Sequence, residues 1–203
     1  MKTISNKKQS LSSKRTLNLL IEALRNLLKE KSFENITVQE LCNKSLIARG
    51  TFYNYFEDKY ELLNYFWYTL TLLIDPVPIE DTNETIPYDI LGYEQYLELF
   101  IEKYITFFDL NVDSLNSIIK HNSLSGYLVH SCRIYLNEYI VSKIKLCNGS
   151  IKFSIPYELV AQYYTNSILT ILEWRYIHKN ETSKEELIKY LRVLIKKSDL
   201  ILN

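Results

Sequence analysis

The sequence contains few cysteines, glycines and prolines, and each shortage excludes a class of protein. Its three cysteines (Cys42, Cys132 and Cys147) are scattered and form no C-x-x-C motif. This pattern argues against a disulfide framework or a structural zinc site and fits a reducing compartment. The four glycines stand too far apart for a phosphate-binding loop, and so few glycines and prolines disfavour a turn-rich all-β fold.

The sequence also lacks a long hydrophobic run. Its most apolar window, Leu62 to Ile74, is too short to span a bilayer and contains an asparagine and two threonines. The basic N-terminus is not followed by a small-residue cleavage site. We therefore expect a soluble, cytoplasmic protein that has no membrane partner.

The net charge of zero hides an uneven distribution. Residues 1–60 carry 11 Lys and Arg against six Asp and Glu, whereas the rest of the chain carries 13 against 18. A basic N-terminal segment on an acidic body is what a nucleic-acid-binding head would show, although a charge excess is usually a solvated face.

Apolar residues recur at helical spacing along most of the chain. The first stripe predicts an amphipathic helix over residues 13–31, and the proline-containing stretch 75–87 is typical of a loop. A long, largely buried helix is expected from Pro156 to His178, and a last apolar stripe begins at Leu187. No segment alternates with a period of two over the length of a strand, so the sequence predicts an all-α fold.

Two short helices with a tight turn between them are indicated within residues 37–55. Thr37 is placed to cap the first helix, and Glu40, three residues on, completes a capping box. Residues 45–47 must turn before the second helix begins at residue 48. Together with the longer helix that precedes them, these helices have the sequence form of a helix-turn-helix.

The second short helix has an unusual composition for a buried element. Phe52 is its plain core residue, and the other positions offer donors, aromatic rings and one site without a side chain. Such a face suits the major groove, because Arg pairs with guanine, Asn pairs with adenine and Gly permits close approach. The alternative is a polar, solvated helix that its glycine weakens.

The stretch from Phe33 to Leu63 resembles the DNA-binding domain of the tetracycline-repressor (TetR) family. It contains Gly-Thr-aromatic-Tyr-x-aromatic-Phe-x-x-Lys-x-x-Leu at residues 50–62, and the resemblance covers roughly residues 13–63. It implies a non-enzymatic regulator of transcription that binds DNA, more commonly as a repressor than as an activator. The expected DNA contacts are Thr37, Arg49, Gly50, Thr51, Tyr53, Asn54, Tyr55 and Lys59.

Within that set the resemblance implies phosphate contacts for Thr37, Tyr53 and Lys59. The other side chains would face bases or phosphates. The alternative for Thr37 is a capping role only, and the alternative for Tyr53 and Tyr55 is core packing.

Two positions depart from the family's pattern. Leu46 stands where the family has a turn glycine, and Ala48 stands where a serine usually caps the recognition helix. Loss of that cap costs about 1 kcal/mol locally. Both departures bear on the geometry of the turn and on the affinity for DNA.

The rest of the chain is similar to the family's divergent regulatory domain. Residues 171–187 are similar to the ends of a subgroup that includes regulators of dihydroxyacetone kinase operons. In the family the last two helices pair with those of a second subunit, which implies a homodimer on a near-palindromic operator in double-stranded DNA. The alternative is that they pack within one chain. The expected interface residues are Leu169, Leu172, Leu187, Leu191 and Leu194.

Large aromatic residues on the apolar stripes of the body point to an effector pocket. Such stripes are more often plain core, but each buried tyrosine hydroxyl needs a partner. We expect a mostly apolar small molecule with a few polar atoms, or else a partner protein, as the effector. The expected pocket residues are Trp67, Tyr104, Phe108, Tyr135 and Tyr164.

No arrangement of residues indicates an enzyme, a cofactor or a metal centre. His121, His130 and His178 lack the H-E-x-x-H spacing. The alternative is a metal-sensing site built across helices from His121, His130, Cys132 and a carboxylate. Two other functions also stay open: a helical ligand-binding or interaction module that has lost DNA affinity, and a helical hydrolase whose nucleophile and base cannot be identified.

The prediction is therefore an all-α protein with an N-terminal three-helix helix-turn-helix head joined to a larger helical regulatory domain. We place the DNA-binding domain at residues 10–60 and the effector-binding and dimerisation domain at residues 61–203.

Overall fold

A computed structural model describes residues 11–75, 90–146, 152–178, 181–195 and 201–202 of the chain. The predicted all-α fold is confirmed. Within the described residues the only sheet is an antiparallel pair of two-residue strands, β1 (Lys152–Phe153) and β2 (Ile201–Leu202). No helix in the described part of the chain is long and apolar enough to cross a membrane.

The chain divides into two compact units, each described here by itself. The first consists of residues 1–71 and 113–131, and the second of residues 72–112 and 132–203. This division differs from the predicted boundary after residue 60. The reason is that the fourth helix continues past residue 60, while residues 113–131 return to pack in the first unit.

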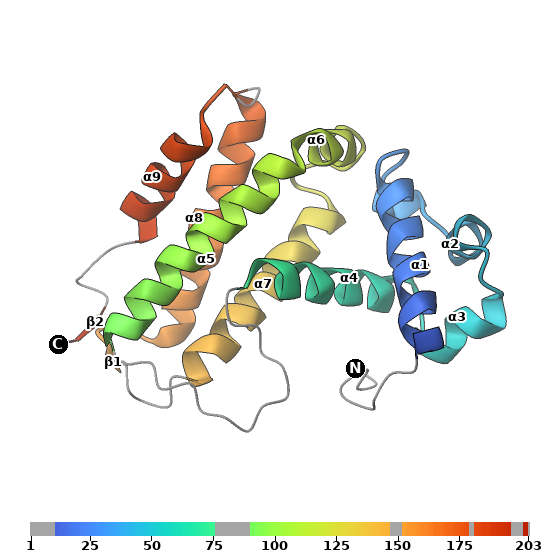
Figure 1. Cartoon of the computed structure of the whole chain (residues 1–203), viewed down its shortest axis with the longest axis horizontal. Coiled ribbons are helices and arrows are strands. Elements are labelled where there is room, and N and C mark those ends of the chain that lie inside the picture. The colour runs from blue at the N-terminus through green and yellow to red at the C-terminus, as the bar shows by residue number, and fades with distance from the viewer. Residues whose placement is uncertain (1–10, 76–89, 147–151, 179–180, 196–200, 203) are drawn as a thin grey trace. The chain divides into compact units, whose positions relative to one another are not determined.

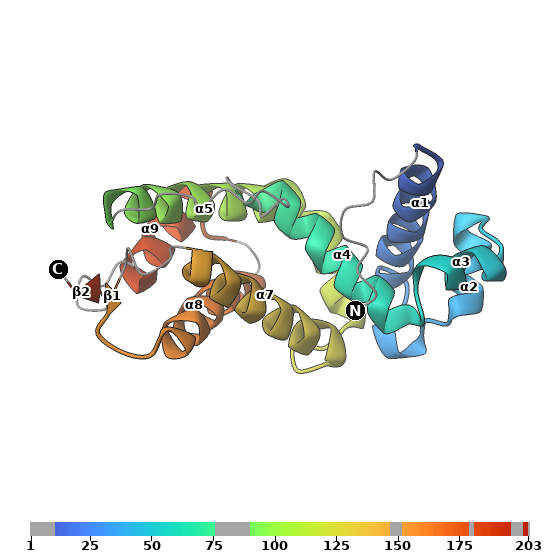
Figure 2. The same ribbon diagram turned by 90° about the horizontal axis from the view of Figure 1, so that it is seen from below.

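The first unit contains the helix-turn-helix and the segments that pack on it. Figures 1 and 2 show its two short helices side by side with the first long helix. Its elements are α1 (Leu11–Leu28), the 3-10 helix η1 (Phe33–Asn35), α2 (Val38–Ser45), α3 (Arg49–Tyr55), the larger part of α4 (Lys59–Ile74), most of α6 (Val112–His121) and the start of α7 (Tyr127–Leu146).

The apolar stripe of α1 forms the centre of the first unit's core. Leu20, Leu24 and Leu28 recur every four residues, so they share one helix face, and none of them is exposed to solvent. Phe33 and Phe52 join the same cluster from η1 and α3. Burying each of these side chains contributes about 1.5–3 kcal/mol, which fixes α2 and α3 on α1.

The second unit is built from long helices. Its helix α9 (Lys184–Ile195) contacts both α5 (Ile90–Leu110) and α8 (Tyr157–Ile177), and Figure 2 shows α9 between them. Ser183 and Glu186 form a capping box at the start of α9, because each backbone N–H donates to the other's side chain.

A buried ion pair lies in the second unit. The Lys143 ammonium lies 2.8 Å from the Asp75 carboxylate, and the two side chains are 8% and 0% exposed. The hydroxyls of Tyr96 and Tyr139 donate to the same carboxylate. The ammonium also lies over both aromatic rings. A buried carboxylate needs such partners, and removing one of them leaves an uncompensated charge.

The leucines expected at a dimer interface are in fact largely core residues of one subunit. Leu187 and Leu191 are 0% exposed and Leu169 is 5% exposed, while Leu172 and Leu194 are half-buried against the same cluster. Burial within a single chain leaves the first three little surface for a second subunit. The interface role of Leu169, Leu187 and Leu191 stays a prediction.

Candidate nucleic-acid interface

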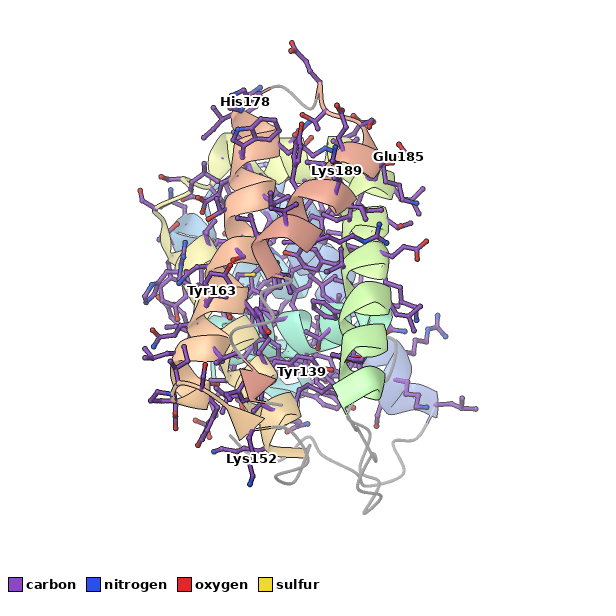
Figure 3. All side chains as sticks on the ribbon, turned by 90° about the vertical axis from the view of Figure 1, so that its left-hand side faces the viewer. Tyr139, Lys152, Tyr163, His178, Glu185 and Lys189 are labelled. Atoms are coloured by element: carbon purple, nitrogen blue, oxygen red, sulfur yellow. The ribbon has the colours of Figure 1, made fainter. Side chains whose placement is uncertain are left out.

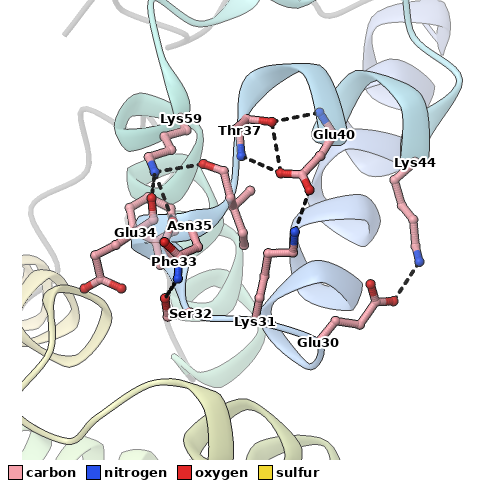
Figure 4. Close-up of polar contacts among 11 residues, drawn as sticks. Glu30, Lys31, Ser32, Phe33, Glu34, Asn35, Thr37, Glu40, Lys44 and Lys59 are labelled. Carbon is pink, nitrogen blue, oxygen red and sulfur yellow. Dashed lines mark hydrogen bonds and ion pairs between the residues drawn. The ribbon is translucent and has the colours of Figure 1, made fainter.

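The predicted capping box at the start of α2 is confirmed. The Glu40 backbone N–H donates to the Thr37 hydroxyl at 3.2 Å, and the Thr37 backbone N–H donates to the Glu40 carboxylate at 3.0 Å (Figure 4). Lys31 pairs with the same carboxylate. Hydrogen bonds from Lys31 and Thr37 lower the pKa of Glu40 to about 2. Thr37 is exposed, so its capping role leaves it at the surface where α2 begins.

The turn after α2 is a Schellman motif with leucine in place of the usual glycine. Ile47 N–H donates to Cys42 C=O at 3.1 Å, and Leu46 N–H donates to Asn43 C=O. Leu46 has φ 57° and ψ 31°, the left-handed conformation. Ile47 packs against the core of the first unit, which completes the motif. The chain thus makes this turn with leucine at the position that glycine usually occupies.

The inner side of α3 anchors the helix to the core. Phe52 is fully buried, and Phe56, which follows the helix, is 1% exposed. Tyr55 is half-buried and packs against the same cluster, so core packing is part of its role. Ala48 precedes α3 without a side-chain cap, as the sequence indicated. Packing rather than capping therefore holds the short helix in place.

The outer side of α3 presents polar side chains to solvent. Arg49 and Asn54 are exposed, Tyr53 is 48% exposed, and Thr51 is half-buried. A hydrogen bond with the Tyr53 side chain is the main cause that raises the pKa of Arg49, so the guanidinium stays charged. These residues lie on one short helix that the core holds from behind.

Gly50 has no packing reason to be glycine. A Cβ built at this position meets no heavy atom of the protein within 4 Å. Glycine inside a helix costs about 1 kcal/mol relative to alanine. Nothing within the described first unit uses the space that Gly50 leaves open on α3.

Lys59 has a structural task that the sequence did not indicate. Its ammonium donates to the carbonyl oxygens of Phe33, Glu34 and Ile36 at 2.8–3.0 Å (Figure 4). It therefore closes the end of η1 against the start of α4. An ammonium has three N–H donors, and all three are used here. The direct phosphate contact expected of Lys59 does not fit this arrangement.

A side chain that no sequence motif indicated joins the residues after α6 to the head. Asn122 is 3% exposed, and its amide accepts from Phe33 N–H at 2.8 Å and donates to Leu28 C=O at 3.1 Å. The Glu34 carboxylate accepts from Tyr127 N–H, the first residue of α7. The α6–α7 turn thus caps the end of α1 and the start of η1.

The predicted pocket residues are not all in one unit. Trp67 lies in the first unit, where it packs against the head cluster and its indole donates to the Ser131 hydroxyl at 3.1 Å. Tyr104, Phe108 and Tyr164 belong to the core cluster of the second unit. Tyr135 lies in the second unit also, stacked on Tyr139. Tyr104, Phe108 and Tyr164 therefore share a core that Trp67 does not join.

The alternative metal site is not assembled. The side chains of His121 and His130 are exposed, whereas burial raises the pKa of the Cys132 thiol to about 12. A metal ligand must be deprotonated, so this thiol is poorly suited to the role. Within the described residues no group of three or more His, Cys, Asp and Glu side chains could hold a metal ion.

Comparison with known proteins places this site in a family. Residues 20–66 match the family described as "Bacterial regulatory proteins, tetR family". A curated relative, the transposon Tn10 TetC protein of Escherichia coli, is 28% identical over 96 residues. That match covers 46% of this chain and 49% of the relative, so the chain spans about half the length of the relative it matches.

Solved structures share the fold over most of the chain. A TetR transcriptional regulator from Streptococcus agalactiae is 20% identical, with a TM-score of 0.58 over 91% of this chain and 95% of that one. The dihydroxyacetone kinase operon activator DhaS is 18% identical, with a TM-score of 0.52 over 89% and 93%. FadR from Bacillus subtilis, solved with stearoyl-CoA, is 16% identical, with a TM-score of 0.54 over 88% and 97%.

The helix-turn-helix, its solvent-facing polar helix and the family match define the class of this site: residues 20–66 form a helix-turn-helix domain of the kind found in bacterial regulatory proteins of the tetR family. The fold of the chain as a whole is similar to that of a solved TetR transcriptional regulator.

Proposed function

We propose that the chain is a homodimeric repressor that binds a near-palindromic operator and leaves it when an effector occupies the second unit. The observation that carries the DNA-binding part is the outer face of α3. Arg49, Tyr53 and Asn54 are held outward there by a buried inner side, and Gly50 leaves room for close approach. This face would enter the major groove, with Arg49 and Asn54 toward the bases and Tyr53 toward phosphate.

Residues around the rim of α3 would complete the DNA contact. Thr37 and Gln39 are exposed at the start of α2, where a helix-turn-helix crosses the sugar-phosphate backbone. Gln39 donates to Asn43 at 2.8 Å, which orients two amides on that surface. We retain Thr37, Thr51 and Tyr55 as expected contacts, with Tyr55 shared between the core and the DNA.

The effector would bind among the aromatic residues of the second unit. Tyr104 and Tyr164 are buried there beside the half-buried Phe108 and form its aromatic core. The Thr165 hydroxyl, on a side chain 1% exposed, has no hydrogen-bond partner within the described residues. A mostly apolar ligand with a few polar atoms would satisfy such a group. Stearoyl-CoA, bound by a similar fold, is a ligand of that mixed character.

The route from the effector to the DNA would run through the α6–α7 turn. Both helices continue beyond the first unit, while Asn122 and Glu34 join the turn between them to the end of α1 and to η1. A shift of α6 or α7 would therefore move or loosen the head. By reciprocity, a ligand that weakens operator binding is itself bound less tightly when the operator is present.

The second subunit would pack on the outer face of α8 and α9. Figure 3 looks onto these helices. Large apolar side chains remain exposed there, with Ile177 at 63%, Val193 at 70% and Tyr190 at 39%. Trp174 is half-buried and meets Tyr190 edge to face. This apolar surface is a better interface than the buried leucines first expected, because it is available to a partner.

Two glutamate substitutions on α9 separate the interface from the core. Val193→Glu should give a folded monomer of about half the dimer mass in sedimentation, whereas Leu191→Glu should disrupt the subunit's own core. Wild type should sediment at about twice the 24.1 kDa chain mass. A Val193→Glu protein that remains a dimer at micromolar concentration would show that the interface lies elsewhere.

Footprinting on the intergenic DNA beside the chain's own gene tests the function. Wild type should protect a near-palindromic site, and affinity should fall steeply as salt rises, because phosphate contacts release counterions. Addition of an effector found by thermal-shift screening should then lower the affinity of a repressor. If the bound protein instead raises promoter output and the effector strengthens its binding, the chain is an activator, as DhaS is named. A protein that binds ligands but protects no DNA would be the interaction module that has lost DNA affinity.

A further inference from the structure

The turn between α2 and α3 contains a backbone conformation that its residue does not favour. Leu46, with φ 57°, is the one non-glycine residue with positive φ in the part of the chain that the structure describes. In this conformation the Cβ of an L-residue crowds neighbouring backbone atoms, which is why glycine usually ends a Schellman motif. Leucine here makes the head less stable than a glycine would.

The Leu46 side chain gives no packing in return. It is 91% exposed, the highest value among the large hydrophobic residues of the described chain. Its neighbour Ile47 turns inward and packs against the core. An isolated exposed leucine needs no explanation, but this one combines exposure with a strained backbone. The combination points to a contact outside the subunit.

The position of Leu46 indicates what that contact is. It stands three residues before Arg49, the first residue of α3. The N-terminal residues of a recognition helix approach the base edges, so the turn just before that helix lies at the groove. A leucine side chain has no donor or acceptor. The apolar group that the major groove offers is the C5-methyl of thymine.

We propose that Leu46 is a specificity-determining residue that reads a thymine methyl group in each half-site. The proposal rests on the proposed function, since it requires the first unit to bind DNA. It also explains why the turn keeps a leucine where glycine would be more stable. Burial of one methyl against the side chain should change affinity by about three- to ten-fold per half-site.

Deoxyuridine differs from thymidine only by that methyl group, which makes it the matched probe. Wild type first selects its preferred palindrome from a random duplex library. Each symmetric thymine pair of that palindrome is then replaced by deoxyuridine, and affinities are measured for wild type, Leu46→Gly and Leu46→Ala. At one thymine pair, the replacement should lower the affinity of wild type by about three- to ten-fold per half-site and leave the affinity of both variants unchanged.

The stability of the variants provides an independent readout. Leu46→Gly relieves the left-handed strain and should raise the melting temperature by about 2–4 °C, whereas Leu46→Ala keeps its Cβ and should not. The expected signature is a variant that is more stable and less discriminating. A merely structural turn residue would not produce this combination.

Three results would overturn the proposal. Deoxyuridine could affect wild type and both variants equally at every thymine. The glycine variant could bind the selected palindrome as tightly as wild type, in which case the exposed leucine serves a protein partner. Both variants could weaken binding to all duplexes alike, which would indicate turn geometry. If wild type selects no sequence at all, the proposed function itself fails, and this outcome is distinct from the other three.

Discussion

Asn122 should be among the most sensitive polar residues of the DNA-binding head. It is 3% exposed, and its amide contacts four backbone groups, of Leu28, Lys31, Phe33 and Ile118. Asn122→Ala removes the partner of Phe33 N–H at 2.8 Å and of Leu28 C=O at 3.1 Å. Each buried backbone group left without a partner costs about 1–3 kcal/mol. We expect a total loss of about 2–4 kcal/mol in the free energy of unfolding of the first unit.

Urea unfolding and amide hydrogen exchange measure this loss at two levels. The unfolding midpoint should fall while the denaturant slope stays unchanged. The Phe33 amide should exchange much faster in the variant, because its acceptor is gone. Asn26→Ala is the matched control, since Asn26 is exposed on α1, and its effect should lie within about 0.5 kcal/mol.

Two results would refute this reasoning. Unfolding of Asn122→Ala within about 0.5 kcal/mol of wild type would mean that water replaces the amide at no cost. An unchanged exchange rate at Phe33 would mean that the hydrogen bond does not protect this amide. Loss of effector response in a variant that stays folded and binds the operator would, by contrast, support the proposed route through the α6–α7 turn.

Three further predictions concern single side chains. The pKa of Glu40 is lowered from 4.5 to about 2, so its contribution to the free energy of unfolding should be complete above pH 4.5 and be lost as the pH falls toward 2. Glu40→Gln keeps an acceptor but does not titrate in this range, so its stability should not show that loss during acid titration. Lys59→Met should lower the free energy of unfolding, measured by urea titration, by about 1–3 kcal/mol, because three carbonyls lose their donor. The same change at the exposed Lys120 is the control and should leave the free energy of unfolding unchanged. Burial raises the pKa of the Cys132 thiol to about 12, so this thiol should resist iodoacetamide at pH 8 until urea unfolds the protein. Rapid alkylation of Cys132 in the native protein, detected by peptide mass mapping, would contradict this prediction.

Local signals in the sequence predicted the local parts of the head. The capping box of Thr37 and Glu40 needs only residues three apart, and it formed as expected. The short helix from Arg49 to Tyr55 was also predicted from its local sequence, in which one inward phenylalanine, Phe52, stands among polar residues. The missing cap at Ala48 could be read directly as well, because capping depends on a single side chain.

Contacts between distant segments gave no such signal. Asn122 contacts backbone groups more than 85 residues earlier in the chain, and a single asparagine does not reveal that. Lys59 matched a pattern associated with DNA contact, yet its ammonium is used by the carbonyls at the end of η1. An apolar stripe such as that of Leu187 and Leu191 predicts burial but does not say whether the partner is the same chain or another.

The unit boundary could not be placed from the sequence for the same reason. The helical pattern of α4 runs through the boundary without a break, and residues 113–131 join the first unit only through tertiary packing. The backbone strain at Leu46 could be predicted only in part. The absence of a glycine was visible in the sequence, whereas the left-handed conformation and the exposed side chain were not.

The most direct test of the central claim compares the base preference of Arg49→Ala with that of wild type. Arg25→Ala is the matched control, since it removes the same charge from α1, where Arg25 pairs with Glu22. Affinities are measured on a set of operators changed one symmetric base pair at a time. If α3 reads the major groove, Arg49→Ala should lose its preference at one position by about 1–3 kcal/mol per contact, and Arg25→Ala should keep every preference. Equal losses for both variants on every operator would contradict the assignment of α3 as the helix that reads the bases.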